Sequence, residues 1–280
     1  MTAATLYIVA TPIGNLDDLS PRARQVLESV DLVAAEDTRH TGRLLAHFCI
    51  AARQIALHEH NESEVVAGII GKLLGGQSVA LVSDAGTPLI RDPGYRLVRA
   101  AHDAGITVTP IPGASAAVAA LSAAGLPGSR FAFEGFLPAK REARLVALRL
   151  LQADRRTLLF FESVHRIEAS LADMAEVFGA GRRAFIGREI SKLHEQCVHA
   201  TLQRLCDMLA AGEIASRGEF VVAVAGAPQV DTTEATVDAS ELLRALLEVL
   251  PGSQAVDLVS KLSGRKRNDV YKEMLRYKSA

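Results

Sequence analysis

The chain has 280 residues, of which 49% are hydrophobic and 22% are charged. This composition is that of an ordinary globular protein and excludes disordered and fibrous classes. At about 150 residues per domain, the length predicts two domains with a cleft between them. The formal net charge of -1 excludes a uniformly basic protein that coats RNA, so any contact with nucleic acid would need a local basic patch.

The cysteines and the apolar segments bear on the cellular compartment. Cys49, Cys197 and Cys206 show no C-x-x-C spacing, so we expect neither a disulfide framework nor a zinc site. The first apolar run, Leu6 to Ala10, follows no basic region, and no apolar stretch reaches about 18 residues. We therefore expect a cytoplasmic protein with no signal peptide, no membrane span and no bound metal.

Up to residue 125, short apolar runs alternate with helical patterns, as in an open parallel sheet. Five strands are expected, at 6–10, 32–35, 54–57, 78–83 and 107–111. Four helices are expected, at 20–30, 38–47, 92–104 and 114–124. Ser20 followed by Pro21 is typical of a helix start, and Gly105 and Gly125 follow two of the expected helix ends.

The pattern restarts at Arg130. Strands are expected at 130–135, 157–162, 183–188, 195–200 and 219–225, with helices at 139–152, 166–178 and 201–211. The predicted fold class is α/β, with two α/β domains that flank a cleft and a small C-terminal helical domain. The predicted boundaries are 1–125 for the parallel-sheet domain, 126–228 for a mixed-sheet domain, 229–239 for a linker and 240–280 for a small basic helical domain.

Polar loops follow each of the first five expected strands. They are rich in Gly, Pro, Asp and Asn and lie at 11–15, 36–39, 58–62, 83–88 and 110–115. Turn formation and helix capping would explain each loop by itself. The carboxyl ends of parallel strands meet at one sheet edge, where ligands bind in open α/β sheets. The five loops together therefore predict one functional site.

Several common chemistries lack their motifs. The sequence has neither G-x-G-x-x-G nor G-x-x-x-x-G-K-[ST], which disfavours hydride and phosphoryl transfer. It also has no G-x-S-x-G turn for a nucleophilic serine. His58 and His60 are expected to share one face at a strand end, but Glu59 and Glu62 need not point the same way, so a zinc site is not predicted.

Taken in order, the loops resemble the tetrapyrrole methylase superfamily of S-adenosylmethionine-dependent enzymes, and within it the branch that acts on ribosomal RNA. The similarity spans residues 6 to 226. The blocks that carry it are Ala10 to Leu16, Ala35 to Arg39, His58 to Glu62, Ser83 to Pro93, Phe133 to Pro138, Phe161 to Arg166, Gly187 to Glu189 and Lys192 to Glu195. The chain departs from the family pattern at Val164, where Pro is usual, and at Ala225, where an acidic residue is common.

The resemblance implies that S-adenosyl-L-methionine binds in the cleft between the two domains, held largely by main-chain atoms, in a homodimer. The implied cofactor contacts are Pro12, Asp84, Gly86, Leu89, Ser115, Ala116, Phe161 and Ala225. The residue types suit this role. Gly86 lets the backbone approach a ligand, Ser115 opens a helix whose amides favour a carboxylate, and Asp84 can accept hydrogen bonds.

The resemblance also implies methyl transfer to the ribose 2'-hydroxyl of a cytidine in the decoding region of 16S rRNA, within the small ribosomal subunit. A side chain must take the hydroxyl proton. The candidates that remain open are Glu36, Asp37, Glu59, His60, Glu162, Glu189 and Lys192. Candidate contacts to the RNA are Arg39, Lys140, Arg166, Arg188, Lys266 and Arg267, and a solvated helix face is an equal alternative for Lys140.

The segment from Lys261 to Ala280 holds seven Lys or Arg against two acidic residues, which predicts an electrostatic grip on RNA or, nearly equally, an exposed solubilising helix. Two other functions stay open. A small-molecule methyltransferase acting on a precorrin-type tetrapyrrole would have a broad apolar pocket and no need for the basic segment. A non-enzymatic RNA-binding module would use the terminal helices but leave the five polar loops unexplained.

Overall fold

The computed structural model describes residues 4–228 and 239–278. The chain divides into two compact units, Met1–Ala227 and Pro228–Ala280. The predicted linker at 229–239 lies outside the described residues except for Ala239, the first residue of a helix. The predicted domain boundaries stay predictions.

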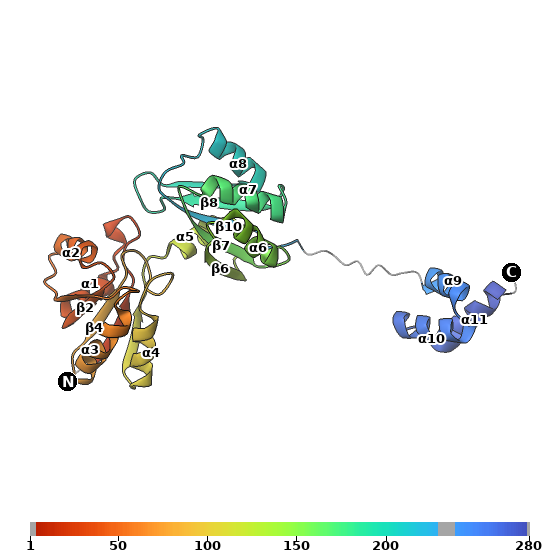
Figure 1. Ribbon diagram of the computed structural model, residues 1–280, viewed down its shortest axis with the longest axis horizontal. Coiled ribbons are helices and arrows are strands. Elements are labelled where there is room, and N and C mark those ends of the chain that lie inside the picture. Colours follow the sequence, from red (N-terminus) through yellow and green to blue (C-terminus); the bar gives the residue numbers. More distant parts are fainter. Residues whose placement is uncertain (1–3, 229–238, 279–280) are drawn as a thin grey trace. The chain divides into compact units, whose positions relative to one another are not determined.

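Unit 1 begins with a parallel sheet of five strands, as predicted (Figure 1). Its strands are β1 (Thr5–Val9), β2 (Leu32–Ala35), β3 (Gln54–Ala56), β4 (Val79–Val82) and β5 (Thr107–Ile111), in the order β3-β2-β4-β1-β5. Side chains alternate between its two faces because strands have a period of two. Val33 and Ala35 pack in one hydrophobic cluster, and Leu32 and Ala34 pack in another on the opposite face.

Helices cover both faces of this sheet. Side chains of α1 (Pro21–Ser29) and α2 (Thr38–His47) contribute to one cluster, and those of α3 (Glu62–Leu74) and α4 (Tyr95–Asp103) contribute to the other. The predicted start of α1 is confirmed, since the Ser20 side chain accepts a hydrogen bond from the backbone N–H of Ala23 and Pro21 is the first helical residue.

Helix α3 was not among the helices expected from the sequence. Val65, Ile69 and Leu73 recur at the helical spacing of four residues and would have indicated it. The expected arrangement of His58 and His60 on a strand face was wrong, because β3 ends at Ala56 and both residues lie in the turn that leads into α3.

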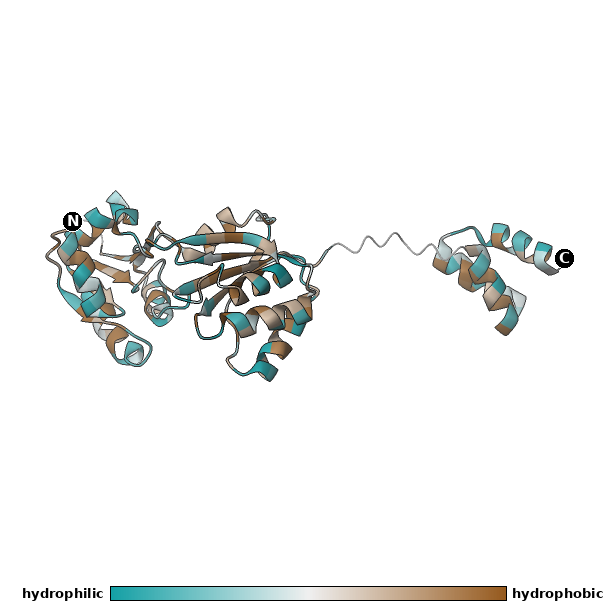
Figure 2. Cartoon of the chain, turned by 90° about the horizontal axis from the view of Figure 1, so that it is seen from above, coloured by the Kyte–Doolittle hydropathy of each residue, from teal (hydrophilic) through white to brown (hydrophobic). Residues whose placement is uncertain are grey.

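The second sheet is mixed, as predicted. Its strands are β6 (Phe131–Phe136), β7 (Thr157–Ser163), β8 (Arg183–Arg188), β9 (Gln196–Thr201) and β10 (Glu219–Val224), in the order β6-β7-β10-β8-β9. Only β6 and β7 pair in parallel; the other neighbours are antiparallel. The strands carry mostly hydrophobic residues, seen as brown arrows in Figure 2, as expected for a sheet covered on both faces.

Helices α6 (Arg141–Leu151), α7 (Ile167–Phe178) and α8 (Leu202–Ala210) pack on one face of the second sheet. Helix α5 (Ala116–Ala123) packs on the other face, where Ala117 and Ala120 have side chains small enough for close contact. A helix that precedes residue 125 therefore completes the core of the second sheet and joins the two halves of unit 1.

Unit 2 consists, in its described part, of three helices, as expected. They are α9 (Ala239–Val249), α10 (Gly252–Ser263) and α11 (Arg267–Lys278). A separate small core holds them together, with Leu243, Val256, Val259, Val270 and Met274 buried in it. None of the helices that the structure describes in either unit is long and apolar enough to cross a membrane.

Candidate functional site

The order of the first sheet creates a crevice at its carboxyl edge. Strands β1 and β4 are neighbours, but the chain leaves β1 toward α1 on one face and leaves β4 toward α4 on the other. Adjacent strands with connections to opposite faces form the usual ligand crevice of open α/β sheets. The sequence predicted the polar loops at this edge, but the point at which they separate depends on the strand order.

Two hydrogen bonds join the loops on the two sides of this crevice. The backbone N–H of Thr11 donates to Gly86 O at 2.9 Å, and Gly86 N–H donates to Thr11 O at 3.1 Å. Gly86 has a φ of +82°, a conformation that residues with a side chain rarely adopt. A Cβ at this position would also lie 3.3 Å from the side chain of Ile13. Glycine therefore keeps the two loops joined at a point where a side chain would be strained.

A cavity of about 370 Å³ lies at the crevice and takes its walls from both halves of unit 1. The first half contributes the loop after β4 and the start of α5. The second contributes the carboxyl ends of β7 and β8 and the first residues of β10, which meet there because β10 runs antiparallel to both neighbours. Cavities of this size hold small molecules and cofactors.

One wall of this cavity is aromatic. The ring of Phe161 lies 5.7 Å from that of Phe136 and 4.7 Å from that of Phe133, in edge-to-face arrangements. The guanidinium carbon of Arg91 lies 5.7 Å from the centre of the Phe136 ring, within the range of a cation–π interaction. The wall therefore combines a broad apolar surface with a cation at its margin.

Half of the predicted cofactor contacts line this cavity, which we call the larger cavity to distinguish it from a second one described below. Gly86, Ser115, Ala116 and Phe161 line the larger cavity. Pro12 and Asp84 instead line a second cavity, of about 350 Å³.

The remaining two predicted contacts, Leu89 and Ala225, line neither cavity. Leu89 packs against the core of the first sheet. Ala225 follows the far end of β10, where its N–H donates to Arg183 O, because the antiparallel strand turns only its beginning toward the cavity. The structure does not support the expected contact at Ala225.

Asp84 joins two of the polar loops at the carboxyl edge of the first sheet. Its Oδ1 accepts a hydrogen bond from Asp37 N–H at 3.1 Å, and its own N–H donates to Glu36 Oε2 at 3.3 Å. These bonds join the loop after β2 to the loop after β4. One carboxylate oxygen of Asp84 is thus already occupied by the protein.

Asp92 lines the larger cavity and was not among the site residues expected from the sequence. Burial raises the pKa of Asp92 to about 6; a hydrogen bond with Ser83 opposes this effect, and the nearby carboxylates of Glu36 and Asp84 add to it. Asp92 lies in the block Ser83 to Pro93, one of the blocks that carry the family resemblance, and this position could have identified it from the sequence. Perturbed acids in cavities are typical of functional sites.

The predicted proton acceptors near β2 and β3 differ in environment. Burial, together with the carboxylates of Asp84 and Glu59, raises the pKa of Glu36, although the hydrogen bond from Asp84 N–H opposes the rise. Hydrogen bonds from Arg39 hold the pKa of Asp37 well below its usual range, which makes Asp37 a poor base. Glu59 and His60 are exposed in the turn before α3 and line neither cavity.

Lys192 lines both cavities. Burial alone would lower the pKa of Lys192, but its Nζ donates to Glu189 Oε1 at 2.9 Å and to Glu219 Oε2 at 3.1 Å, and the net effect raises that pKa. Lys192 therefore stays protonated. The structure favours a cation at this position and not the proton acceptor considered from the sequence.

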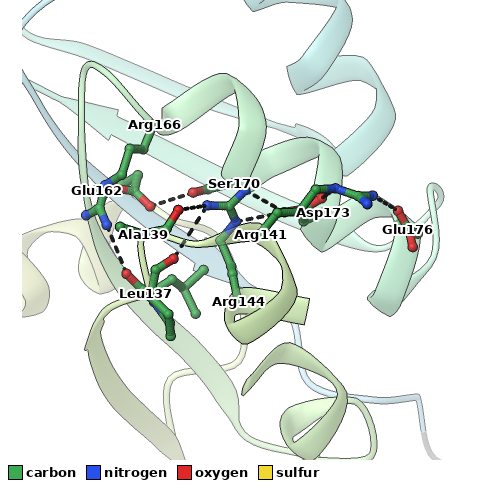
Figure 3. A network of polar contacts seen from close by, with 10 residues as sticks. Leu137, Ala139, Arg141, Arg144, Glu162, Arg166, Ser170, Asp173 and Glu176 are labelled. Atoms are coloured by element: carbon green, nitrogen blue, oxygen red, sulfur yellow. Dashed lines mark hydrogen bonds and ion pairs between the residues drawn. The ribbon is translucent and has the colours of Figure 1, made fainter. Parts of the chain in front are cut away.

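Glu162 belongs to a buried polar network, drawn in Figure 3. Its side chain is 1% exposed and accepts hydrogen bonds from Ser170 Oγ at 2.6 Å and from Ser163 N–H at 2.8 Å. It also pairs with Arg166 at 2.8 Å, and Arg166 donates to Leu137 O. These contacts hold β7 to α7, so neither the predicted proton-acceptor role of Glu162 nor the predicted RNA contact of Arg166 is supported.

A second buried ion pair in the same network joins α6 to α7. The side chains of Arg144 and Asp173 are each 4% exposed and lie 2.7 Å apart (Figure 3). Arg144 also donates to Ala139 O at 3.1 Å. Burying such charges is tolerated only when they are paired and hydrogen-bonded, so this network is structural.

Arg188, another predicted RNA contact, is buried. Its Nε donates to Arg217 O at 2.6 Å and its Nη1 donates to His194 O at 2.8 Å. It closes the loop after β8 and is not available to a partner. The expected contact to RNA at Arg188 is therefore not supported.

The other predicted RNA contacts lie on the surface. Arg39 is 86% exposed and pairs with Asp37, and Lys140 is exposed at the start of α6. In unit 2, Lys266 is exposed, whereas Arg267 pairs with Asp257 at 2.5 Å. Arg39 and Lys140 thus belong to unit 1, whereas Lys266 and Arg267 belong to unit 2. Across residues 4–228 and 239–278, no group of three His, Cys, Asp or Glu side chains is placed to hold a metal ion.

Comparison with known proteins gives matches over nearly the whole chain. The model of the Tetrapyrrole (Corrin/Porphyrin) Methylases matches residues 5–206, and that of the RsmI C-terminal HTH domain matches residues 233–278. Ribosomal RNA small subunit methyltransferase I of Xylella fastidiosa is 51% identical over 270 residues, which cover 96% of this chain and 98% of the relative. The protein of the same name from Pseudomonas aeruginosa is 51% identical over 276 residues, 98% of both chains.

A solved structure shows the same fold at much lower identity. Uroporphyrin-III C-methyl transferase from Thermus thermophilus, complexed with S-adenyl homocysteine, is 19% identical, covers 79% of this chain and 97% of its own, and has a TM-score of 0.54. The family model covers more than half of the chain, and the relatives are about half identical over nearly their whole length. The chain therefore belongs to the tetrapyrrole (corrin/porphyrin) methylase family.

Proposed function

We propose that the chain is an S-adenosylmethionine-dependent methyltransferase that methylates ribosomal RNA of the small subunit. The observation that carries this proposal is the larger cavity, which lies at the crevice of the parallel sheet and is closed by the second sheet. The full-length relatives that are about half identical to this chain bear the name ribosomal RNA small subunit methyltransferase I.

The walls of the larger cavity fit S-adenosylmethionine. Phe136 and Phe161 offer an apolar surface to the adenine ring, and Asp92 can accept hydrogen bonds from ribose hydroxyls or from the ammonium group. The backbone amides that follow Ser115 favour the carboxylate of the cofactor. Glu189 and Glu219 line the cavity together with Lys192, which pairs with both, so this group carries one net negative charge, which suits a sulfonium ion.

The cofactor, when bound, supplies a methyl group already activated on sulfur. The protein must then hold the acceptor oxygen in line with that methyl and keep competing water away. The acceptor hydroxyl must also lose its proton. Asp37, Glu162, Glu189 and Lys192 are held in ion pairs. Glu36, Glu59 and His60 therefore stay as the predicted candidates.

We further propose that the acceptor is the ribose 2'-hydroxyl of a cytidine in the decoding region of 16S rRNA, presented by the small ribosomal subunit. The proposal includes a homodimer working in the cytoplasm. The resemblance of the rim loops to the ribosomal branch supports it, as does the match of the C-terminal residues to a helix-turn-helix model. Unit 2 would add an electrostatic contact to RNA through exposed lysines such as Lys261, Lys266 and Lys272.

The two alternatives explain less of the structure. A tetrapyrrole methyltransferase would account for the apolar wall of Phe136 and Phe161 but would have no need for the basic helices of unit 2. A non-enzymatic RNA-binding module would leave both the cavity and the perturbed acid in its wall without a role.

The test uses the purified chain with radiolabelled S-adenosylmethionine and three substrates: naked 16S rRNA, small ribosomal subunits that lack the modification, and a tetrapyrrole precursor. We expect label in the ribose of a cytidine, with subunits as the better substrate. Nuclease digestion and mass spectrometry of the labelled nucleoside locate the methyl group. Label in the tetrapyrrole alone would reject the proposal.

A further inference from the structure

The second cavity adjoins the larger one and has no role in the reaction described so far. Its walls come from the loop after β1, from α2 and from the start of the loop after β4. It shares Ile13, Ala85, Lys192 and Glu219 with the larger cavity. A group bound in the second cavity would therefore meet a group bound in the first across these four residues.

Two basic side chains of α2 face this second cavity. His40 and Arg43 are three residues apart, so they lie on the same face of the helix, and both line the cavity. Both side chains are exposed and make no ion pair or side-chain hydrogen bond with any described residue. The neighbouring cation Arg39 differs, because Asp37 neutralises it.

The carboxylates of the second cavity, in contrast, already have partners. Asp84 Oδ1 accepts from Asp37 N–H, and Glu219 Oε2 accepts from Lys192 Nζ. Arg43 thus has no carboxylate partner in the described part of the chain, whereas Lys192 in the same cavity is paired with Glu219. A guanidinium matches the geometry of a phosphate group with two parallel hydrogen bonds.

The remaining wall of the second cavity is apolar. Pro12, Leu16 and Leu44 line it, and Leu16 is 39% exposed although it is a large hydrophobic residue. An apolar wall opposite a guanidinium and an imidazole is suited to a ligand with a flat or sugar part and an anionic part. A nucleotide within an RNA strand has both.

We propose that the second cavity receives the acceptor nucleotide of the RNA. Arg43 and His40 bind its phosphodiester, and the wall of Pro12, Leu16 and Leu44 packs against its sugar and base. This inference rests on the proposed function and adds the place where the substrate binds. It predicts that the acceptor enters from the α2 side, while the cofactor occupies the larger cavity.

The test compares Arg43→Ala, Arg43→Lys and His40→Ala with the wild type, using unmethylated small ribosomal subunits as substrate. Arg22→Ala is the matched control, because Arg22 is an exposed arginine of α1 that lines neither cavity. We expect Arg43→Ala to raise KM for subunits about tenfold. The slope of log KM against log salt concentration should fall by about one, the value for the loss of one phosphate contact. Arg43→Lys should recover part of this loss, and Arg22→Ala should change KM less than about twofold.

The affinity for S-adenosylmethionine, measured by calorimetry, separates the possible results. An unchanged cofactor Kd together with a raised KM supports the inference. An unchanged KM in both Arg43→Ala and His40→Ala overturns it, and so does a parallel loss of cofactor affinity, since the cavity would then belong to the cofactor. Failure of the wild type to methylate any RNA would instead reject the proposed function. Because both side chains are exposed, unaltered melting curves check that the variants fold.

Discussion

Replacing Asp92 by asparagine separates its role in binding from its effect on stability. The change keeps the size of the side chain and removes a charge from the wall of the larger cavity. If the carboxylate accepts hydrogen bonds from the cofactor, Asp92→Asn should weaken S-adenosylmethionine binding by about 10- to 100-fold at pH 7.5, since hydrogen bonds to charged groups contribute about 1.5–3 kcal/mol.

The pKa of Asp92 predicts how cofactor binding varies with pH. With a pKa of about 6, Asp92 is ionised in about nine-tenths of the molecules at pH 7 and in about one-tenth at pH 5. If only the ionised form binds, the wild-type affinity should fall about tenfold between these pH values. Asp92→Asn should show a much flatter profile, because asparagine does not ionise.

The same pKa predicts that Asp92→Asn stabilises the fold. The pKa is raised from 3.8 to about 6, so ionisation opposes folding above pH 4, and the full cost is reached above pH 6. A fully buried group would account for about 3 kcal/mol, which partial exposure reduces to about 1 kcal/mol. Asp92→Asn should therefore raise Tm by about 2–4 °C at pH 7.5 and have no effect at pH 4.

Titration calorimetry at pH 5, 6, 7 and 8 and thermal melts from pH 4 to pH 8 test both expectations. Asp84→Asn is a useful comparison, because Asp84 lies outside the larger cavity and joins two loops. A cofactor affinity that Asp92→Asn leaves unaltered at pH 7.5 would refute the assignment of Asp92 to the cofactor. A wild-type affinity independent of pH would refute the reasoning from its pKa.

Two further predictions concern the buried network and unit 2. Glu162→Gln removes one charge of the pair with Arg166 and should lower the free energy of unfolding by about 3 kcal/mol, measured by urea denaturation; an unchanged midpoint would show that the pair does not hold β7 to α7. Deletion of residues 236–280 should raise KM for small subunits, while cofactor affinity stays the same. The increase in KM relative to the full-length chain should be larger at low salt than at high salt. Methylation of subunits that is unaffected at every salt concentration would contradict the proposed RNA contact of unit 2.

Local sequence patterns were sufficient for most of the strands and helices. Short apolar runs marked the strands of the first sheet, and signals such as Ser20 before Pro21 marked helix starts, because both depend on residues close together in the chain. The helix α3 was missed, since its start at Asn61 has no side-chain cap and follows directly on a polar loop.

The roles of charged residues could not be predicted in the same way. Glu162, Arg166 and Arg188 stand in motif blocks just as Asp92 does, but the first three are engaged in ion pairs or in hydrogen bonds to backbone carbonyl groups, whereas burial raises the pKa of Asp92 to about 6. The carbonyl group of Arg217 that accepts from Arg188 lies 29 residues away in the chain, and Asp173 lies 29 residues from its partner Arg144, so no local pattern indicates these contacts.

By itself, the sequence determined the α/β class, the five polar loops at one sheet edge and the family, because these follow from local periodicity and ordered motifs. Only the tertiary structure decided which loops face each other across the crevice, that β10 presents Glu219 and not Ala225 to the site, and that His40 and Arg43 line a second cavity. The physical reason is that strand order, strand direction and charge pairing arise from contacts between segments far apart in the chain.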